Sequence, residues 1–225
     1  MCELQDEIKK LIVKNININD FDKEWKEWND LDALPKIKNI TIIERKNIQG
    51  SRYDEENKKS IDYKFMEYTK WKSKNVKQCV AIGFNPAKIN PNEIDSTNKK
   101  LITELNNMDY NSYILLNLYP QVSTNKNTFN ETDTIDEKFQ NILLEILSLL
   151  IDQAIDTIIF WGRTVSISNE IYSKLIKLQE KNHLFMTIKK GDKKQHCHPA
   201  YIQIQIIKVS NDNYLVTTHK LLGEQ

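Results

Sequence analysis

Four short apolar segments, each separated from the next by a helical pattern, constrain the fold of this chain more than any other feature. Both faces of each segment are hydrophobic, which is typical of strands that are buried on both sides of a parallel sheet. The helical patterns between them favour a sheet that is covered by helices on both faces. The sequence therefore predicts an α/β fold with a central, mostly parallel four-stranded sheet. The strand segments are Cys79–Ile82, Tyr113–Leu118, Thr157–Trp161 and Leu184–Ile188.

Three helical patterns connect these strands. The first begins with a cap at Asp95, Ser96 or Thr97, because short polar side chains at that position satisfy the free amide groups of a first turn. The second begins at Thr134 and has a wide apolar face, and the third runs from about Ser166 to Gln179. These patterns predict the helices that cover the sheet.

The N-terminal residues have a different pattern. Apolar residues recur at helical spacing over Leu4–Ile12 and over Phe21–Leu31, which predicts two N-terminal helices. The polar segment Arg45–Lys59 indicates a loop, and the alternation over Ile61–Trp71 favours an edge or hairpin strand. We therefore expect residues 1–60 to form a helical extension packed on the core.

Residues 61–225 are expected to form the α/β domain, with a hairpin at its C-terminal end. Tyr201–Lys208 alternates around three isoleucines, and Tyr214–Thr218 follows a turn at Asn211–Asn213. These two segments predict the strands of the hairpin.

Composition and charge limit the class of partner. The 225 residues include 32 Lys and Arg against 31 Asp and Glu, and the net charge is +1. A nucleic-acid partner must therefore be met by a local patch. The three cysteines lie far apart and fit a reducing compartment. With neither a long apolar segment nor a signal-peptide pattern, we expect a cytoplasmic protein without membrane contact.

Unusual residues follow the end of each predicted strand. Ligands of open α/β sheets lie beyond the carboxyl ends of the strands. Pro86 biases Asn85 toward an extended conformation, and Gly83 removes a side chain where the chain leaves the sheet. We expect Asn85, Asn117 and His198 to surround one pocket, although an ordinary strand exit is the alternative at Asn85. The four strand ends are Asn85-Pro86, Asn117-Leu118-Tyr119-Pro120, Trp161-Gly162-Arg163 and His196-Cys197-His198-Pro199.

Several short motifs in this order resemble a known family. The motifs are Asn85-Pro86-Ala87, Asp95-Ser96-Thr97, Asn117-Leu118-Tyr119-Pro120, Trp161-Gly162 and His198-Pro199-Ala200-Tyr201. Over roughly residues 76–202 they are similar to a bacterial and phage family, the domain of unknown function 1643. That family in turn looks like the uracil-DNA glycosylase superfamily, which has a three-layer α/β/α fold. The resemblance implies that residues 61–225 form a uracil-DNA glycosylase-like domain.

The resemblance also implies roles for individual residues. Asn85 would orient an attacking water, Asn117 would hydrogen-bond the edge of a base, and His198 would donate to the departing base. A flipped base would stack on an aromatic side chain such as Phe84, Tyr119 or Phe129. The sequence departs from the glycosylase pattern in two places. Ala200 to Ile202 stand where the glycosylases have a serine and a wedge residue after His-Pro. Asn85 also activates water less than an aspartate at this position would.

Basic residues close to these motifs suggest phosphate contacts. Lys190, Lys193 and Lys194 lie in one segment with Lys189, and Arg163 follows the third strand. A solvated loop is the alternative. The adjacent His196 and His198 lack the usual spacing of metal ligands, so we expect no metal and no cofactor.

The sequence leads to two main functional hypotheses. One is a uracil-DNA glycosylase-like enzyme that recognises a nucleobase in nucleic acid or a nucleotide and hydrolyses an N-glycosidic bond. The other is a non-catalytic module that binds a nucleotide or nucleic acid, for example in conflict between phage and host. A structural or partner-binding protein, in which the strand-end residues are incidental, is a third alternative.

Overall fold

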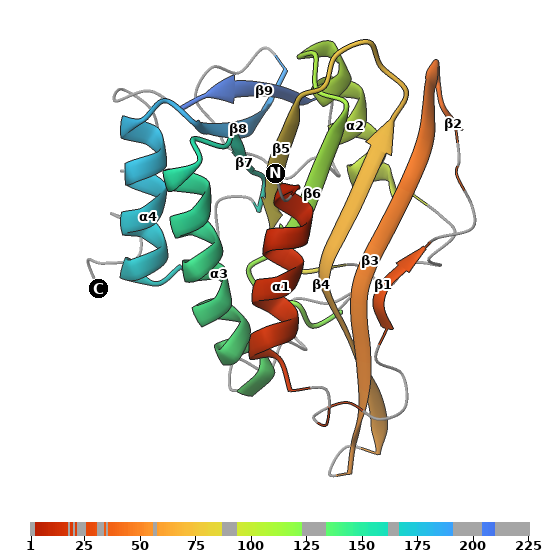
Figure 1. Cartoon of the computed structure of the whole chain (residues 1–225), viewed down its shortest axis with the longest axis vertical. Coiled ribbons are helices and arrows are strands. Elements are labelled where there is room, and N and C mark those ends of the chain that lie inside the picture. Colours follow the sequence, from red (N-terminus) through yellow and green to blue (C-terminus); the bar gives the residue numbers. More distant parts are fainter. Residues whose placement is uncertain are drawn as a thin grey trace.

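The computed structural model describes residues 3–17, 19, 21, 26–30, 34, 36–55, 58–86, 94–122, 134–161, 167–190 and 204–209, with the backbone alone for 26–30 and 134. One mixed sheet forms the middle of the molecule, and helices pack on both of its faces (Figure 1). The strands are β1 (Lys26–Asp30), β2 (Lys36–Ile37), β3 (Ile40–Asp54), β4 (Lys59–Trp71), β5 (Gln78–Gly83), β6 (Ser112–Asn117), β7 (Thr157–Ile159), β8 (Leu184–Lys189) and β9 (Ile204–Lys208).

The described strands follow the order β1-β3-β4-β6-β5-β7-β8-β9, and β2 pairs with β3. The neighbours β6, β5, β7 and β8 are parallel. The remaining pairings are antiparallel and lie on both sides of this parallel block. The sheet therefore changes from antiparallel to parallel where β4 meets β6.

The prediction of a central, mostly parallel four-stranded sheet is wrong. The four apolar segments do form the parallel block, but the sheet continues beyond both of its edges and is mostly antiparallel. β3 was not recognised because Arg45–Lys59 carries many polar residues, and β4 and β9 were predicted as strands but not as neighbours of the parallel block. Such pairings depend on the register between strands, which local periodicity does not reveal.

Two further predictions for the N-terminal residues are wrong. Lys26–Asp30, predicted to be helical, forms β1 and pairs with β3. Arg45–Lys59, predicted to be a loop, supplies most of β3 and the start of β4, which pair along their length in a hairpin. Figure 1 shows this hairpin extending past the helices. The predicted strand Ile61–Trp71 is confirmed as part of β4. It is a hairpin strand, paired with β3, and not an edge strand, because it lies between β3 and β6.

At the other end of the chain, the predicted hairpin is only partly described. Ile204–Lys208 forms β9, and its observed partner is β8, to which it is antiparallel. Tyr214–Thr218 lies outside the described residues.

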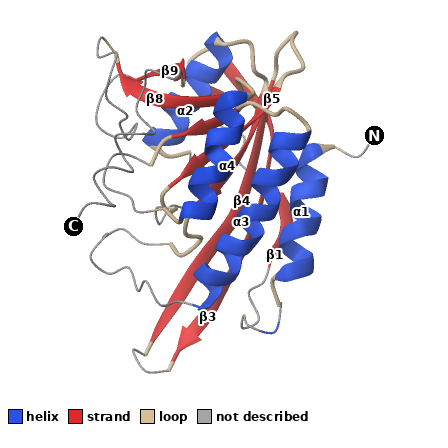
Figure 2. Cartoon of the chain, turned by 90° about the vertical axis from the view of Figure 1, so that its left-hand side faces the viewer, coloured by secondary structure: helices blue, strands red, loops and turns tan. Residues whose placement is uncertain are grey.

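The helices are α1 (Leu4–Asn15), α2 (Ser96–Asn107), α3 (Thr134–Asp152) and α4 (Asn169–Glu180). α1, α3 and α4 lie side by side on one face of the sheet, and α2 lies on the other (Figures 1 and 2). The predicted helices between the parallel strands are confirmed, and so is the cap of α2, where the Asp95 side chain accepts a hydrogen bond from Asn98 N at 2.6 Å. Among the described helices, none has the length and apolar character that a membrane crossing requires.

Two apolar clusters, one on each face, hold these layers together. The α3-side cluster lies under α1, α3 and α4 and includes Ile8, Phe139 and Leu175. The α2-side cluster includes Leu101 and Leu105. Successive residues of β5 alternate between the two clusters, as expected for a strand that is buried on both faces.

Candidate functional site

The carboxyl ends of β5 and β6 are fixed to each other. Gly83, the last residue of β5, lies opposite Asn117, the last residue of β6. Beyond this pair, Leu118 N donates to Gly83 O at 2.9 Å, and Tyr119 N donates to Phe84 O at 3.0 Å. The structure therefore brings the first two predicted strand-end motifs to the same edge of the sheet.

The side chain of Asn117 lies against the backbone of Gly83. Its Oδ1 atom is only 2.7 Å from the position that a Cβ atom on Gly83 would occupy, and the ring of Phe160 comes equally close. Only glycine allows both groups to approach the strand in this way. Gly83 therefore creates the space in which the amide and the ring meet.

The amide of Asn117 is buried and available. The residue is only 4% exposed, and its side chain makes no hydrogen bond to another described residue. Neither polar atom of the amide is among the fully buried side-chain atoms without a partner in the described residues, so the amide keeps contact with the surface. An amide that reaches the surface at a strand end suggests a place for a ligand.

The amide and the two predicted stacking residues lie on different sides of the sheet end. Asn117 shares the α2 side with Phe160, which belongs to the α2-side cluster. Phe84 and Tyr119 pack on the α3-side cluster, with their ring centroids 5.3 Å apart in an edge-to-face arrangement. Asn85 is half-buried and directly follows Phe84.

The remaining predicted site residues are less fully described. Lys190 is exposed and directly follows β8. Arg163, Lys193, Lys194 and His198 lie outside the described residues, as does Phe129. In the part of the chain that the structure describes, no group of three or more His, Cys, Asp or Glu could hold a metal ion.

Sequence reasoning missed a buried ion cluster next to Asn117. Arg45 Nη2 donates to Glu67 Oε1 at 3.0 Å, and Lys64 Nζ lies 3.3 Å from Glu67 Oε2. Arg45 and Glu67 are only 3% and 2% exposed. Glu67 pairs with Leu115, two residues before Asn117 on β6, so the ion cluster and the amide lie on the same face of the sheet.

A β-bulge makes this ion cluster possible. The pairing of β3 with β4 passes from Ile48–Met66 to Gln49–Lys64 and skips Phe65. In a regular strand, residues three apart point to opposite faces. The extra residue shifts this alternation and places Lys64 on the same face as Glu67. A glutamate within an aromatic and apolar strand was the available signal for this cluster in the sequence.

The charges of this cluster depend on burial and on close partners. Burial alone raises the pKa of Glu67, but Lys64 and Arg45 outweigh it and hold the pKa below its usual range. Burial also raises the pKa of Asp95 at the start of α2, although the backbone amide of Asn98 opposes the shift, and the charge of Glu67 adds to the rise. A fixed ionic group therefore lies close to the available amide and to the start of α2.

A family comparison covers most of these residues. A family model described as "Protein of unknown function (DUF1643)" matches residues 67–200, which is more than half of the chain. The chain belongs to this family. The matched region begins at Glu67 and includes Asn85 and Asn117.

No match was found among curated proteins, and none was found among solved structures. Membership of the DUF1643 family confirms that part of the sequence prediction. The resemblance to the uracil-DNA glycosylases stays a prediction.

The ion cluster leads to a prediction about stability and pH. Replacing Arg45 by methionine leaves Glu67 buried with one cationic partner, so we expect a loss of about 3–5 kcal/mol of unfolding free energy near pH 7. Because the pKa of Glu67 is lower in the folded state, its charge stabilises the wild type at pH values above the unfolded pKa of about 4.3. This stabilisation is lost as the pH falls through the folded pKa. In the variant that pKa rises, so the difference between the proteins should shrink toward acidic pH. Urea unfolding at several pH values measures this.

A neighbouring ion pair provides the control for this experiment. Lys46→Met removes the partly exposed Lys46–Glu44 pair on β3, and we expect it to cost less than about 1 kcal/mol. The double variant Arg45→Met/Glu67→Gln should recover part of the lost stability. A cost of Arg45→Met that equals that of Lys46→Met, with no pH dependence, would contradict the role of the buried cluster.

The close contact at Gly83 leads to a second prediction. In Gly83→Ala the new methyl group meets the Asn117 amide and the Phe160 ring, so we expect a loss of about 1–3 kcal/mol in unfolding free energy. Removing the amide as well, in Gly83→Ala/Asn117→Ala, should cost less than the sum of the two single changes. Chemical denaturation of the four proteins measures the coupling, and strictly additive costs would show that the two groups do not meet.

Proposed function

We propose that the edge of the sheet at Gly83 and Asn117 recognises a nucleobase. The observation that carries this proposal is the amide of Asn117, which is 4% exposed and has no hydrogen bond to another described residue. A primary amide presents a donor and an acceptor next to each other, and the edges of nucleobases present complementary pairs of such groups. A ligand that pairs with both groups of the amide gains two directional hydrogen bonds.

The surroundings of the amide hold it in one place. Gly83 lacks a side chain, so the amide oxygen lies against its backbone, and the ring of Phe160 closes the space beside it. The donor and acceptor of the amide are therefore fixed before a ligand binds. The Lys64–Glu67–Arg45 cluster provides fixed polar groups on the same face, and its ion pairs hold them in place.

The candidate reaction at this site is hydrolysis of an N-glycosidic bond. Cleavage builds positive charge on the sugar and negative charge on the base, so a fixed donor to the base stabilises the transition state. By resemblance to the glycosylases, His198 is that donor and Asn85 orients the water. A non-catalytic module would use the same amide to bind a nucleotide or nucleic acid without breaking this bond.

The proposal predicts a selective loss of affinity in Asn117→Ala. Removal of a hydrogen bond to a base edge should weaken binding by about 1–3 kcal/mol, or roughly 5- to 150-fold. Calorimetric titration with a panel of nucleosides and nucleoside monophosphates measures the affinity, and thermal unfolding measures the stability of the same protein. We expect a small change in stability, because the amide has no partner to lose among the described residues.

The matched control lies at the opposite end of β6. Asn111 is also buried, at 5% exposed, and its Oδ1 accepts a hydrogen bond from Lys77 N at 3.0 Å. Asn111→Ala should therefore lower stability and leave nucleoside affinity unchanged. Equal effects of the two substitutions on affinity would contradict the proposal. Release of free base from an oligonucleotide by the wild type supports the hydrolase, and binding without release supports the module.

A further inference from the structure

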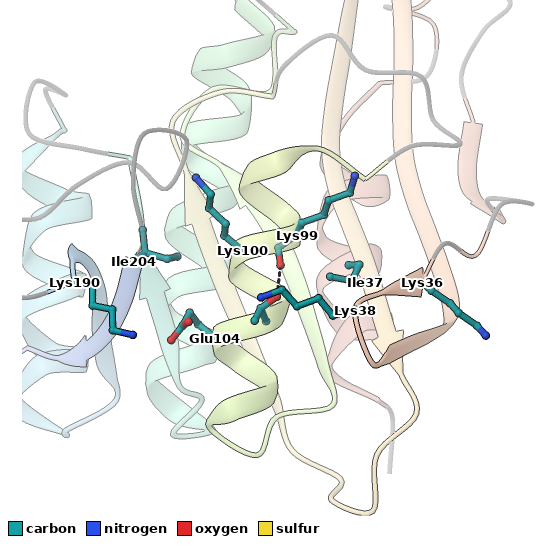
Figure 3. Close-up of a pocket in the computed structure, with 9 residues that line it drawn as sticks. Lys36, Ile37, Lys38, Lys99, Lys100, Glu104, Lys190 and Ile204 are labelled. Atoms are coloured by element: carbon teal, nitrogen blue, oxygen red, sulfur yellow. Dashed lines mark hydrogen bonds between the residues drawn. The ribbon is translucent and has the colours of Figure 1, made fainter.

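A groove of about 720 Å³ crosses the outer side of α2. Figure 3 shows β2 and the turn after it on one side of the helix and the ends of β8 and β9 on the other. The charged residues that line it are Lys36, Lys38, Lys99, Lys100, Glu104 and Lys190. Parts of the chain that are distant in the sequence therefore contribute to one surface.

Positive charge dominates this groove. Five of its lining residues are lysines, against the single carboxylate of Glu104, although the charges of the whole chain almost cancel, to a net +1. Lys36, Lys38, Lys99 and Lys190 form no ion pair with any described residue. Gathered charge without counterions produces a strong local potential that attracts anions.

The groove reaches the edge of the sheet that carries the candidate site. Lys99 lies in the first turn of α2, where its backbone amide donates to Asp95 O at 2.9 Å. Lys190 directly follows the carboxyl end of β8, where Lys189 pairs with Ile204. The lysines at this end of the groove therefore lie at the same edge of the sheet as Asn117.

We propose that this groove binds the sugar–phosphate backbone of a nucleic-acid strand whose base occupies the site at Asn117, an inference that rests on the proposed function. Lys38 reaches across α2, Lys190 points toward it from β8, and Lys99 lies in its first turn (Figure 3). Charges spread in this way suit a series of phosphates better than the single phosphate of a nucleotide. Lysine contacts to phosphate position a strand without reading its sequence. The substrate class is therefore a polymer, and the lysines hold it while the amide reads one base.

The experiment measures the affinity of a labelled single-stranded oligonucleotide, as DNA and as RNA, over a salt series. Each phosphate contact contributes a slope of about −0.7 to log K against log salt for a single strand. We expect Lys38→Gln to weaken binding and to reduce the steepness by about 0.7, and Lys99→Gln/Lys190→Gln to reduce it by about 1.4. The control is Lys14→Gln/Lys177→Gln, which removes the same charge as the double groove variant from exposed positions of α1 and α4 on the other face. This control should bind like the wild type.

The outcomes separate the groove from the base site. Equal weakening in the control and groove variants, or binding without salt dependence, would overturn the groove. A nucleoside monophosphate that loses as much affinity as the oligonucleotide in the groove variants would overturn the assignment to a polymer. If the groove variants lose oligonucleotide affinity but Asn117→Ala keeps full nucleoside affinity, the strand-binding groove stands and the proposed base site fails.

Discussion

The parallel register of β5 and β6 is the constraint on which the candidate site depends. It places Gly83 opposite Asn117, and the backbone hydrogen bonds just beyond this pair hold the two strand exits together. Because Gly83 has no side chain, the amide can lie against the strand beside Phe160. The same strand β6 pairs antiparallel with β4, which brings Glu67 to the same face. The boundary between the parallel and antiparallel parts of the sheet is therefore where the amide and the buried charges meet.

The local pattern of apolar and capping residues was sufficient to predict the buried strands and the start of α2. The four apolar segments became neighbouring parallel strands, and Asp95 caps α2 as its position suggested. It failed for β3, because Arg45 and Asn47 are polar residues in a strand and each is buried. Arg45 finds its partner 22 residues away on β4, and a local window contains no sign of such pairing. At Phe21–Leu31 the aromatic spacing fitted a helix, but pairing with β3 makes Lys26–Asp30 a strand.

For the candidate site, the sequence predicted the residues at the strand ends but not those that long-range strand pairing brings beside them. Strand-end motifs located Asn85 and Asn117, because a buried run followed by glycine, proline or asparagine marks the carboxyl edge of a sheet. The ion cluster was missed since it needs a bulge at Phe65 to bring Lys64 onto the face of Glu67. The lysine-lined groove also depends on topology, because Lys36, Lys99 and Lys190 become neighbours only through the hairpin of β2 with β3 and the reversal between β8 and β9.

The central claim is that the side chain of Asn117 forms hydrogen bonds with a nucleobase. Nuclear magnetic resonance of the protein labelled with nitrogen-15, titrated with a nucleoside, observes that side chain directly, and Asn117→Ala assigns its signals. The account predicts that the Nδ2 protons of Asn117 shift downfield and exchange more slowly with solvent at saturation, while those of Asn111 keep their positions. Saturation by the nucleoside with unchanged Asn117 signals, and with shifts elsewhere in the protein, would contradict it.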